Sequence, residues 1–111
     1  MSRKARGRET EKLVVQYFID HGFTTAHLTS SSAPGSDVLG IEGLDCEVKA
    51  RAKFDPLAAM AQLRARSKEK GLGVAVMRMN GQGPAQIDEW VGIVRFADLM
   101  YLLKAAGYGQ R

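Results

Sequence analysis

The stretch PGSDVLGIEGLDCEVK, which spans residues 34–49, decides how the rest of the chain is organised. It predicts two short strands, 37–41 and 44–51, that are joined by a tight turn. Glu47 and Lys49 lie two residues apart on the second strand, so their side chains point to the same side of the sheet. A carboxylate and an ammonium group on one side of an otherwise apolar strand need a partner or a function.

The length of the turn decides which side of the sheet the carboxylate of Asp37 takes. A two-residue loop would put Asp37 across from Val48, on the side away from Glu47. A three-residue loop, 42–44, puts Asp37 across from Lys49 and on the same side as both charged groups. We predict this second register, or a bulge with the same effect, because it gathers the charged side chains on one side of the sheet.

The remaining pattern predicts a three-layer α/β domain, in which helices flank a mixed sheet of about five strands. The expected helices span 8–21, 56–70 and 96–106, and the expected strands lie within 22–32, 37–41, 44–51, 73–79 and 89–96. Residues 85–88 are ambiguous. We expect a flexible basic N-terminal arm over 1–7, a single domain over 8–107 and a short C-terminal tail over 108–111.

The totals agree with one globular domain. The chain has 111 residues, a formal net charge of +4 and 45% hydrophobic residues. No run approaches the roughly 18 apolar residues of a membrane span, and no apolar segment follows the basic start as in a signal peptide. A single cysteine excludes an internal disulfide and zinc sites built on paired cysteines. We therefore expect a cytoplasmic protein that has no membrane partner.

Basic residues gather in three places around the acidic stretch. They are Arg3, Lys4, Arg6 and Arg8 at the start, Arg51 and Lys53 after the second strand, and Arg64, Arg66, Lys68 and Lys70 late in the second helix. Any one of these clusters fits a solvated helix face or end. Three clusters around one acidic site favour the backbone of a nucleic acid as the partner.

Helical phase separates the two acids of the first helix. At about 100° per residue, Glu11 falls near the apolar stripe that contains Val14 and Phe18. Glu9 falls on the opposite, polar side with Lys12, so we expect Glu9 to be solvated. Glu11 instead approaches the interior edge, where a carboxylate needs a positive partner.

The acidic stretch has the ligands of a magnesium site. Asp37 and Glu47 can supply two carboxylates to Mg²⁺, and Mn²⁺ suits the same set. The Val48 carbonyl would add a third oxygen, and Glu11 would serve a second ion or orient a water molecule. Lys49 should stay positively charged and offset the charge that develops on a phosphate. The pattern therefore predicts metal-dependent hydrolysis of phosphodiesters.

Each of these residues also has a structural interpretation. Glu47 and Lys49 fit an ion pair on an exposed face, Asp37 fits a turn cap, Glu11 fits a pair with Arg8 or Lys12, and Gln62 fits a surface amide on the second helix. His21 and His27 fit surface or half-buried structural roles. The order and spacing of the whole set favour the functional interpretation.

In that order, the residues resemble the PD-(D/E)XK nuclease superfamily, and most of all the archaeal-type Holliday junction resolvases. The matching residues are Arg6-Gly7, Glu11, His21-Gly22-Phe23, Ser30-Ser31-Ser32, Asp37 and Glu47-Val48-Lys49. They cover about the first half of the chain, through Gln62, while the second half agrees only in the order of its elements. Ser36 departs from the pattern, which has a proline before the aspartate.

The resemblance implies a restriction-endonuclease-like fold and a homodimer that cuts four-way or other branched DNA. It implies that Glu11, Asp37, Glu47 and Lys49 are catalytic and metal-binding, with Gln62 as a weaker accessory. The expected DNA-binding residues are Arg3, Lys4, Arg6, Arg8, Ser30, Ser31, Ser32, Arg51, Lys53 and Arg64. The dimer interface would use Trp90, Phe96, Leu99, Met100, Leu102 and Leu103, which are also apolar enough to close the core.

Two other functions share much of this pattern. A repair or restriction-type endonuclease would act on ordinary duplex DNA, but it normally carries extra segments for base readout, and 111 residues leave little room for them. A non-catalytic DNA-binding module of the same fold would have no physical reason to keep the complete acidic set with Lys49. A flavodoxin-type enzyme is disfavoured, because no glycine-rich phosphate loop follows a strand and opens a helix.

Overall fold

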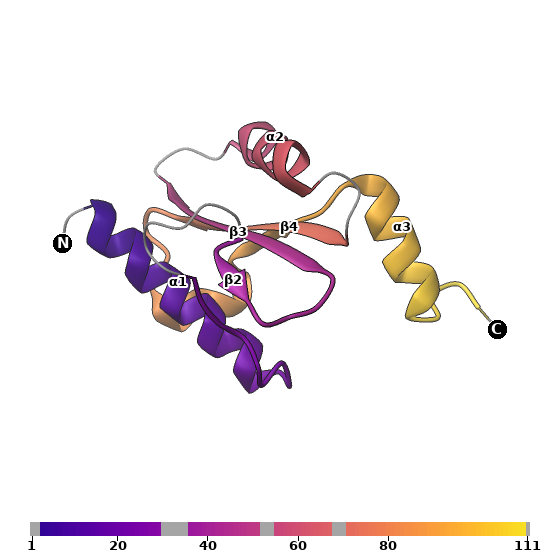
Figure 1. Cartoon of the computed structure of the whole chain (residues 1–111), viewed down its shortest axis with the longest axis horizontal. Helices are drawn as coiled ribbons and strands as arrows, with labels where there is room; N and C mark the ends of the chain where they lie inside the picture. Colours follow the sequence, from indigo (N-terminus) through magenta and orange to yellow (C-terminus); the bar gives the residue numbers. More distant parts are fainter. Residues whose placement is uncertain (1–2, 30–35, 52–54, 68–70, 111) are drawn as a thin grey trace.

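The computed structural model describes residues 3–29, 36–51, 55–67 and 71–110. The elements in chain order are α1 (Arg3–Asp20), β1 (His27–Leu28), β2 (Val38–Leu39), β3 (Leu44–Arg51), α2 (Pro56–Ser67), β4 (Leu72–Met79), the 3₁₀ helix η1 (Pro84–Glu89), β5 (Val91–Ile93) and α3 (Phe96–Ala105). They form an α/β domain around a mixed five-stranded sheet, which confirms the predicted class (Figure 1). Within the described ranges, no helix is long and apolar enough to cross a bilayer.

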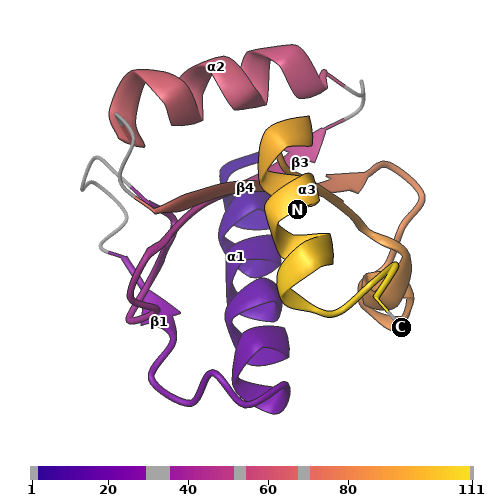
Figure 2. The ribbon, with the colours of Figure 1, turned by 90° about the vertical axis from the view of Figure 1, so that its right-hand side faces the viewer.

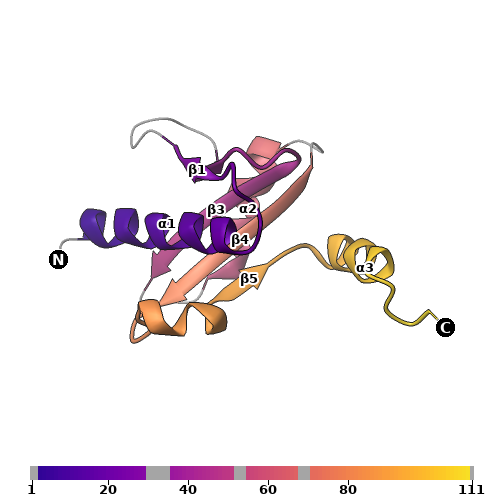
Figure 3. The same cartoon turned by 90° about the horizontal axis from the view of Figure 1, so that it is seen from below.

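The two long strands form the centre of the sheet. The strand order is β1-β2-β3-β4-β5, and β3 and β4 pair in parallel along their whole length (Figure 3). All other neighbours are antiparallel. A parallel pair needs a long crossover connection, and α2 provides it between β3 and β4. The middle strand of the sheet is therefore β3, which carries Glu47 and Lys49.

The helices α1 and α2 cover opposite sides of the sheet (Figures 1 and 2). The buried cluster beneath α1 contains Val14, Val15, Ala26, Val38, Cys46, Val48 and Trp90. The smaller cluster beneath α2 contains Ala59, Leu63 and Ala75. Because residues of a strand alternate between the two sides, Cys46 and Val48 face α1, while Glu47, which pairs with Ala75, faces α2.

The helix α1 begins at Arg3 instead of Arg8, so residues 3–7 are not the arm that we expected. A tertiary contact and a local one support the added turn. The guanidinium of Arg6 donates to the Met79 carbonyl of β4 at 3.4 Å, and within α1 the Thr10 hydroxyl donates to the Arg6 carbonyl at 2.8 Å. Arg, Lys and Ala are also good helix formers, so the local sequence supports the longer helix.

Several strand boundaries also differ from the predicted ones. Only His27–Leu28 of the β-prone run 22–32 forms a strand, and its residues 30–32 lie outside the described ranges. β5 is shorter than the predicted 89–96, because residues 84–89 form η1. The second helix starts as predicted, since the Asp55 carboxylate accepts a hydrogen bond from the Ala58 N–H at 3.2 Å.

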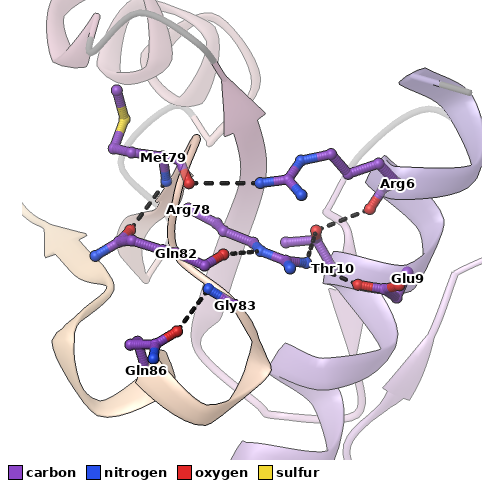
Figure 4. Close-up of polar contacts among 8 residues, drawn as sticks. All are labelled: Arg6, Glu9, Thr10, Arg78, Met79, Gln82, Gly83 and Gln86. Atoms are coloured by element: carbon purple, nitrogen blue, oxygen red, sulfur yellow. Dashed lines mark hydrogen bonds and ion pairs between the residues drawn. The ribbon is translucent and has the colours of Figure 1, made fainter. Parts of the chain in front are cut away.

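A buried cation joins α1 to the central sheet. Arg78 on β4 is only 4% exposed, and its Nη1 donates to Glu9 Oε1 at 2.8 Å and to Thr10 Oγ1 at 3.0 Å (Figure 4). Its Nε donates to the Gln82 carbonyl at 2.8 Å. The guanidinium also lies over the Trp90 ring, 5.0 Å from the centroid. A buried guanidinium is stable only with such partners.

Glu9 is therefore not the solvated residue that helical phase predicted. Phase places Glu9 away from the apolar stripe, but the first turns of α1 run beside the end of β4, where Arg78 needs an anion. The sequence did contain a signal for this pair. Arg78 is a charged residue inside an otherwise apolar central strand, and such a charge requires a partner from another element.

Replacing Glu9 with Gln should lower the free energy of unfolding by roughly 1–2 kcal/mol, because it removes the charged partner of a buried guanidinium while keeping the shape. The Glu9 side chain is 36% exposed, so solvent screens part of the pair. Urea denaturation measures the change. Glu42→Gln on the exposed turn is the control, with an expected change within about 0.5 kcal/mol. Equal stabilities of the two variants would show that the ion pair does not hold α1.

Candidate functional site

The pairing of β2 with β3 places Asp37 opposite Glu47. Val38 pairs with Cys46, so the next step outward along both strands puts Asp37 across from Glu47. Opposite residues of antiparallel strands lie on the same side of the sheet. The two carboxylates therefore meet at the point where the pairing of β2 with β3 ends.

The predicted register, with Asp37 across from Lys49, is wrong by two residues. Residues 40–43 connect β2 to β3, so Leu44 lies in β3, where it pairs with Leu72 on β4, instead of in the loop. The Leu72 N–H also donates to the Gly43 carbonyl at 2.7 Å, which keeps Gly43 in the turn. A shift of two residues leaves the side of the sheet unchanged, since side chains alternate with a period of two.

The start of β2 is fastened to β3 by polar contacts. Asp37 Oδ2 accepts a hydrogen bond from the Val48 N–H at 2.7 Å, and the Asp37 N–H donates to the Cys46 carbonyl at 2.8 Å. The hydroxyl of Ser36 accepts from the Cys46 N–H at 2.9 Å. Ser36, which the sequence marked only as a departure from a motif, thus helps to position Asp37.

Glu47 and Lys49 form a buried ion pair, not the exposed one of the structural interpretation. Lys49 Nζ lies 3.1 Å from Glu47 Oε2, and the two side chains are 14% and 6% exposed. Taking both charges out of water is costly and is repaid only by good geometry and further polar contacts. A buried carboxylate paired with a nearly buried ammonium group on a central strand is thus an unusual arrangement for a purely structural pair.

The other three predicted site residues lie close enough to Asp37 to influence its pKa. Burial raises this pKa from 3.8 to about 6, while the hydrogen bond from the Val48 N–H lowers it. The negative charges of Glu47 and Glu11 raise the pKa of Asp37 further, and the positive charge of Lys49 lowers it. Glu11, Asp37, Glu47 and Lys49 therefore form one electrostatic cluster, which we call the candidate site.

Glu11 enters the candidate site from α1 and is held there by Arg8. Arg8 Nη1 lies 3.1 Å from Glu11 Oε1, and the same nitrogen donates to the Thr29 carbonyl at 3.1 Å. The pair with Arg8 that we considered as a structural alternative is therefore present. Because Arg8 binds both α1 and the end of the β1 segment, it positions Glu11 as well as neutralising it.

The other predicted residues are more dispersed. Gln62 and Arg64 are exposed on α2, on either side of the buried Leu63. Arg6 turns inward to the Met79 carbonyl. Ser30, Ser31, Ser32 and Lys53 lie outside the described residues; for Arg3, Lys4 and Arg51, the structure describes only the backbone. His21 and His27 are exposed and bond to backbone carbonyls of their own segments.

The donor set fits a hard cation with few protein ligands. Within the described ranges, no three carboxylate, imidazole or thiol groups lie close enough together to hold a metal ion. Mg²⁺ usually takes only one or two protein carboxylates and completes its shell with water and substrate, so Asp37 and Glu47 suffice. In a strand, the N–H and C=O of one residue point the same way, so the Val48 carbonyl faces the side of Asp37.

Comparisons of the chain with protein-family models, with curated proteins and with solved structures gave no match in any of the three. The features of the chain that bear on its function are the placement of Asp37 opposite Glu47, the ion pair of Glu47 with Lys49, and the approach of Glu11 from α1.

Replacing Asp37 with Asn should stabilise the fold above about pH 6 and have little effect near pH 4. The pKa of Asp37 is about 6 in the folded chain and 3.8 ordinarily, so as the pH rises the unfolded chain loses this proton first. The wild type thus loses stability between these values, and the Asn variant does not. Because the carboxyl is partly exposed, the gain should be on the order of 1 kcal/mol.

Chemical denaturation of both proteins between about pH 4 and pH 8 measures this difference. Asn keeps a side-chain oxygen that can accept the hydrogen bond from the Val48 N–H, so the comparison isolates the charge. A difference between the two proteins that stays constant over this range would contradict the raised pKa of Asp37.

Proposed function

We propose that this chain is a metal-dependent DNA endonuclease with a restriction-endonuclease-like fold, and that it acts as a Holliday junction resolvase. The observation that carries the proposal is the candidate site, where residues from α1, β3 and the start of β2 form one electrostatic cluster around Asp37. Each residue takes the role that its resemblance to the PD-(D/E)XK superfamily implies. The homodimer implied by the same resemblance is part of the proposal.

In the proposed reaction, water attacks a DNA phosphorus, and the bond from phosphorus to one sugar oxygen breaks. A bound Mg²⁺ or Mn²⁺ supplies positive charge for the phosphate oxygens and makes water more acidic. Asp37 and Glu47 hold the ion, and Glu11 orients the attacking water. Lys49 is held 3.1 Å from Glu47 and directs its ammonium group at the charge that develops on the phosphate.

The placement of basic segments supports DNA as the substrate. Arg51 ends β3 and pairs with Met79, the last residue of β4, so both strands finish at the same end of the sheet. Arg6 contacts the Met79 carbonyl, which brings the start of α1, with Arg3 and Lys4, to that end as well (Figure 3). Arg51 on β3 and the basic residues at the start of α1 would thus bind the phosphate backbone of the same DNA.

Cleavage of a labelled four-way junction and of a linear duplex, with Mg²⁺ or with EDTA, tests the proposal. We expect the wild type to cut the junction in preference to the duplex and to require the metal. Glu47→Ala and Lys49→Met should each lower the single-turnover rate by about 100-fold or more, the scale for removing a group that stabilises transition-state charge. Glu42→Gln should retain the wild-type rate.

The outcome of this experiment separates the alternatives. Equal cutting of junction and duplex would favour a repair or restriction-type endonuclease with the same catalytic residues. Binding of either DNA without metal-dependent cutting would favour a non-catalytic DNA-binding module. Cutting that survives in both Glu47→Ala and Lys49→Met would place the active site elsewhere.

Metal binding can be tested without DNA. Mg²⁺ should raise the Tm of the wild type, because it binds carboxylates that repel one another only in the folded chain. At a concentration of about 100 times Kd, the expected gain is roughly 2.7 kcal/mol. Asp37→Asn and Glu47→Gln should lose most of the shift, and Glu42→Gln should keep it. A shift of the same size in all four proteins would show that the ion binds outside the candidate site.

A further inference from the structure

Arg8 joins α1 to the segment after β1, beside the candidate site. It lies one turn before Glu11, and its Nη1 lies 3.1 Å from Glu11 Oε1. The same nitrogen donates to the carbonyl of Thr29 at 3.1 Å, and Thr29 is only 9% exposed. The guanidinium is therefore held between two segments that are 21 residues apart in the sequence.

The contact with Thr29 makes this pair different from a surface ion pair. The side chains of Arg8 and Glu11 are 33% and 20% exposed, so water screens their attraction less than it would on an open helix face. A pair with this spacing on an exposed helix is weak. Here the hydrogen bond to the Thr29 carbonyl also keeps the guanidinium from turning to solvent, so its positive charge stays beside Glu11.

The charges of the cluster suit a single divalent cation. The carboxylates of Glu11, Asp37 and Glu47 supply three negative charges when they are ionised. Arg8 and Lys49 supply two positive charges, so the five side chains together carry a net charge of −1. One divalent cation and one phosphodiester, with charges of +2 and −1, bring the total to zero. A second divalent cation would leave two uncompensated positive charges in partly buried surroundings, which is costly.

The contacts of Glu11 agree with this count. Its Oε1 accepts a hydrogen bond from Arg8, and a carboxylate that is already neutralised is a weaker ligand for Mg²⁺, which gives up its water reluctantly. The other oxygen, Oε2, can still accept a hydrogen bond from a water molecule. The sequence left two roles open for Glu11, a second ion and the orientation of a water molecule. The contact with Arg8 favours the water molecule.

We propose that Arg8 is a positioning residue that takes the place of a second metal ion, so that the candidate site binds one Mg²⁺ or Mn²⁺ per chain. Arg8 acts through Glu11, whose charge it neutralises and whose position it fixes. The sequence predicted Arg8 only as one of several DNA-binding cations. The inference rests on the proposed function, because it requires that Asp37 and Glu47 bind a metal ion.

Titration of the full chain with Mn²⁺ counts the bound ions without DNA. Electron paramagnetic resonance measures the free ion, at about pH 8, where Asp37 is ionised. The wild type should bind one ion per chain. Over the same range of free Mn²⁺, Arg8→Met should bind two, because the cluster then carries a net charge of −2 and Glu11 has lost its guanidinium partner. Lys12→Met is the matched control, since it removes an exposed cation next to Glu11 on α1, and it should bind one ion.

Three further variants separate the charge of Arg8 from its contribution to folding. Arg8→Lys keeps the positive charge but loses the planar guanidinium, and it should bind one ion. Glu11→Gln in an otherwise wild-type chain should also bind one ion, with a Kd changed by less than about tenfold, because Glu11 is not a ligand. The double variant Arg8→Met/Glu11→Gln should return from two ions to one, since the second ion needs the carboxylate of Glu11.

The ion counts distinguish failure of the inference from failure of the proposed function. One ion in both the wild type and Arg8→Met, or two ions in the wild type, would overturn the inference and leave metal-dependent cleavage intact. A second ion that binds to Arg8→Lys, or that remains in Arg8→Met/Glu11→Gln, would overturn it as well. No bound ion in the wild type, or an ion that remains in Asp37→Asn/Glu47→Gln, would contradict both the proposed metal site and the role of Arg8.

Discussion

The buried guanidinium of Arg78 is the constraint on which the arrangement of the first helix depends. Arg78 lies near the end of β4 and donates to Glu9 and Thr10 on α1 and to the carbonyl of Gln82 after β4. Segments nearly 70 residues apart in the sequence are thus fixed to one cation (Figure 4). Because a buried charge is tolerated only when its partners are in place, the pair sets both the rotation of α1 and its position along β4.

The position of α1 matters for the candidate site. Glu11 follows two residues after Glu9, and its charge acts on Asp37 across the end of β2. Asp37 and Glu47 then oppose each other on neighbouring strands, and both are partly or wholly withdrawn from water. Carboxylates in this arrangement destabilise one another, and a cation relieves the repulsion. Lys49 provides one positive charge, and the proposed metal ion provides more.

The short length of β2 is as important as the long parallel pair. β3 and β4 form a rigid centre, and β2 covers β3 only at Val38–Leu39, so the Val48 N–H and C=O lie beyond the paired segment. The Asp37 carboxylate, instead of a backbone carbonyl, accepts the hydrogen bond from the Val48 N–H. Because β2 is short, the carboxylate of Asp37 occupies the place where a longer β2 would have put a backbone carbonyl bonded to the Val48 N–H.

The boundaries of the helices and strands show how much of the fold could be predicted from the sequence. The start of α2, with its cap at Asp55, and the start of β3 at Leu44 follow from local signals, namely turn residues, capping and apolar periodicity. The start of α1 does not, because Arg6 and Thr10 bind to β4 from the other half of the chain. The alternative that α3 closes the core also did not occur, because no residue of α3 is buried. Apolar periodicity indicates that a helix face needs a partner, but it does not identify that partner.

The sequence by itself determined the α/β class, the order of the elements and the side of the sheet that Glu47 and Lys49 share, because these depend on periodicity and parity along one segment. Only the tertiary structure decided the register of Asp37, the partner of Glu9 and the exposure of α3. The register followed from the pairing of Leu44 with Leu72, and the partner of Glu9 from a buried charge on β4. Both are contacts between segments far apart in the chain, and a pattern within one segment carries no information about the free energy of such contacts.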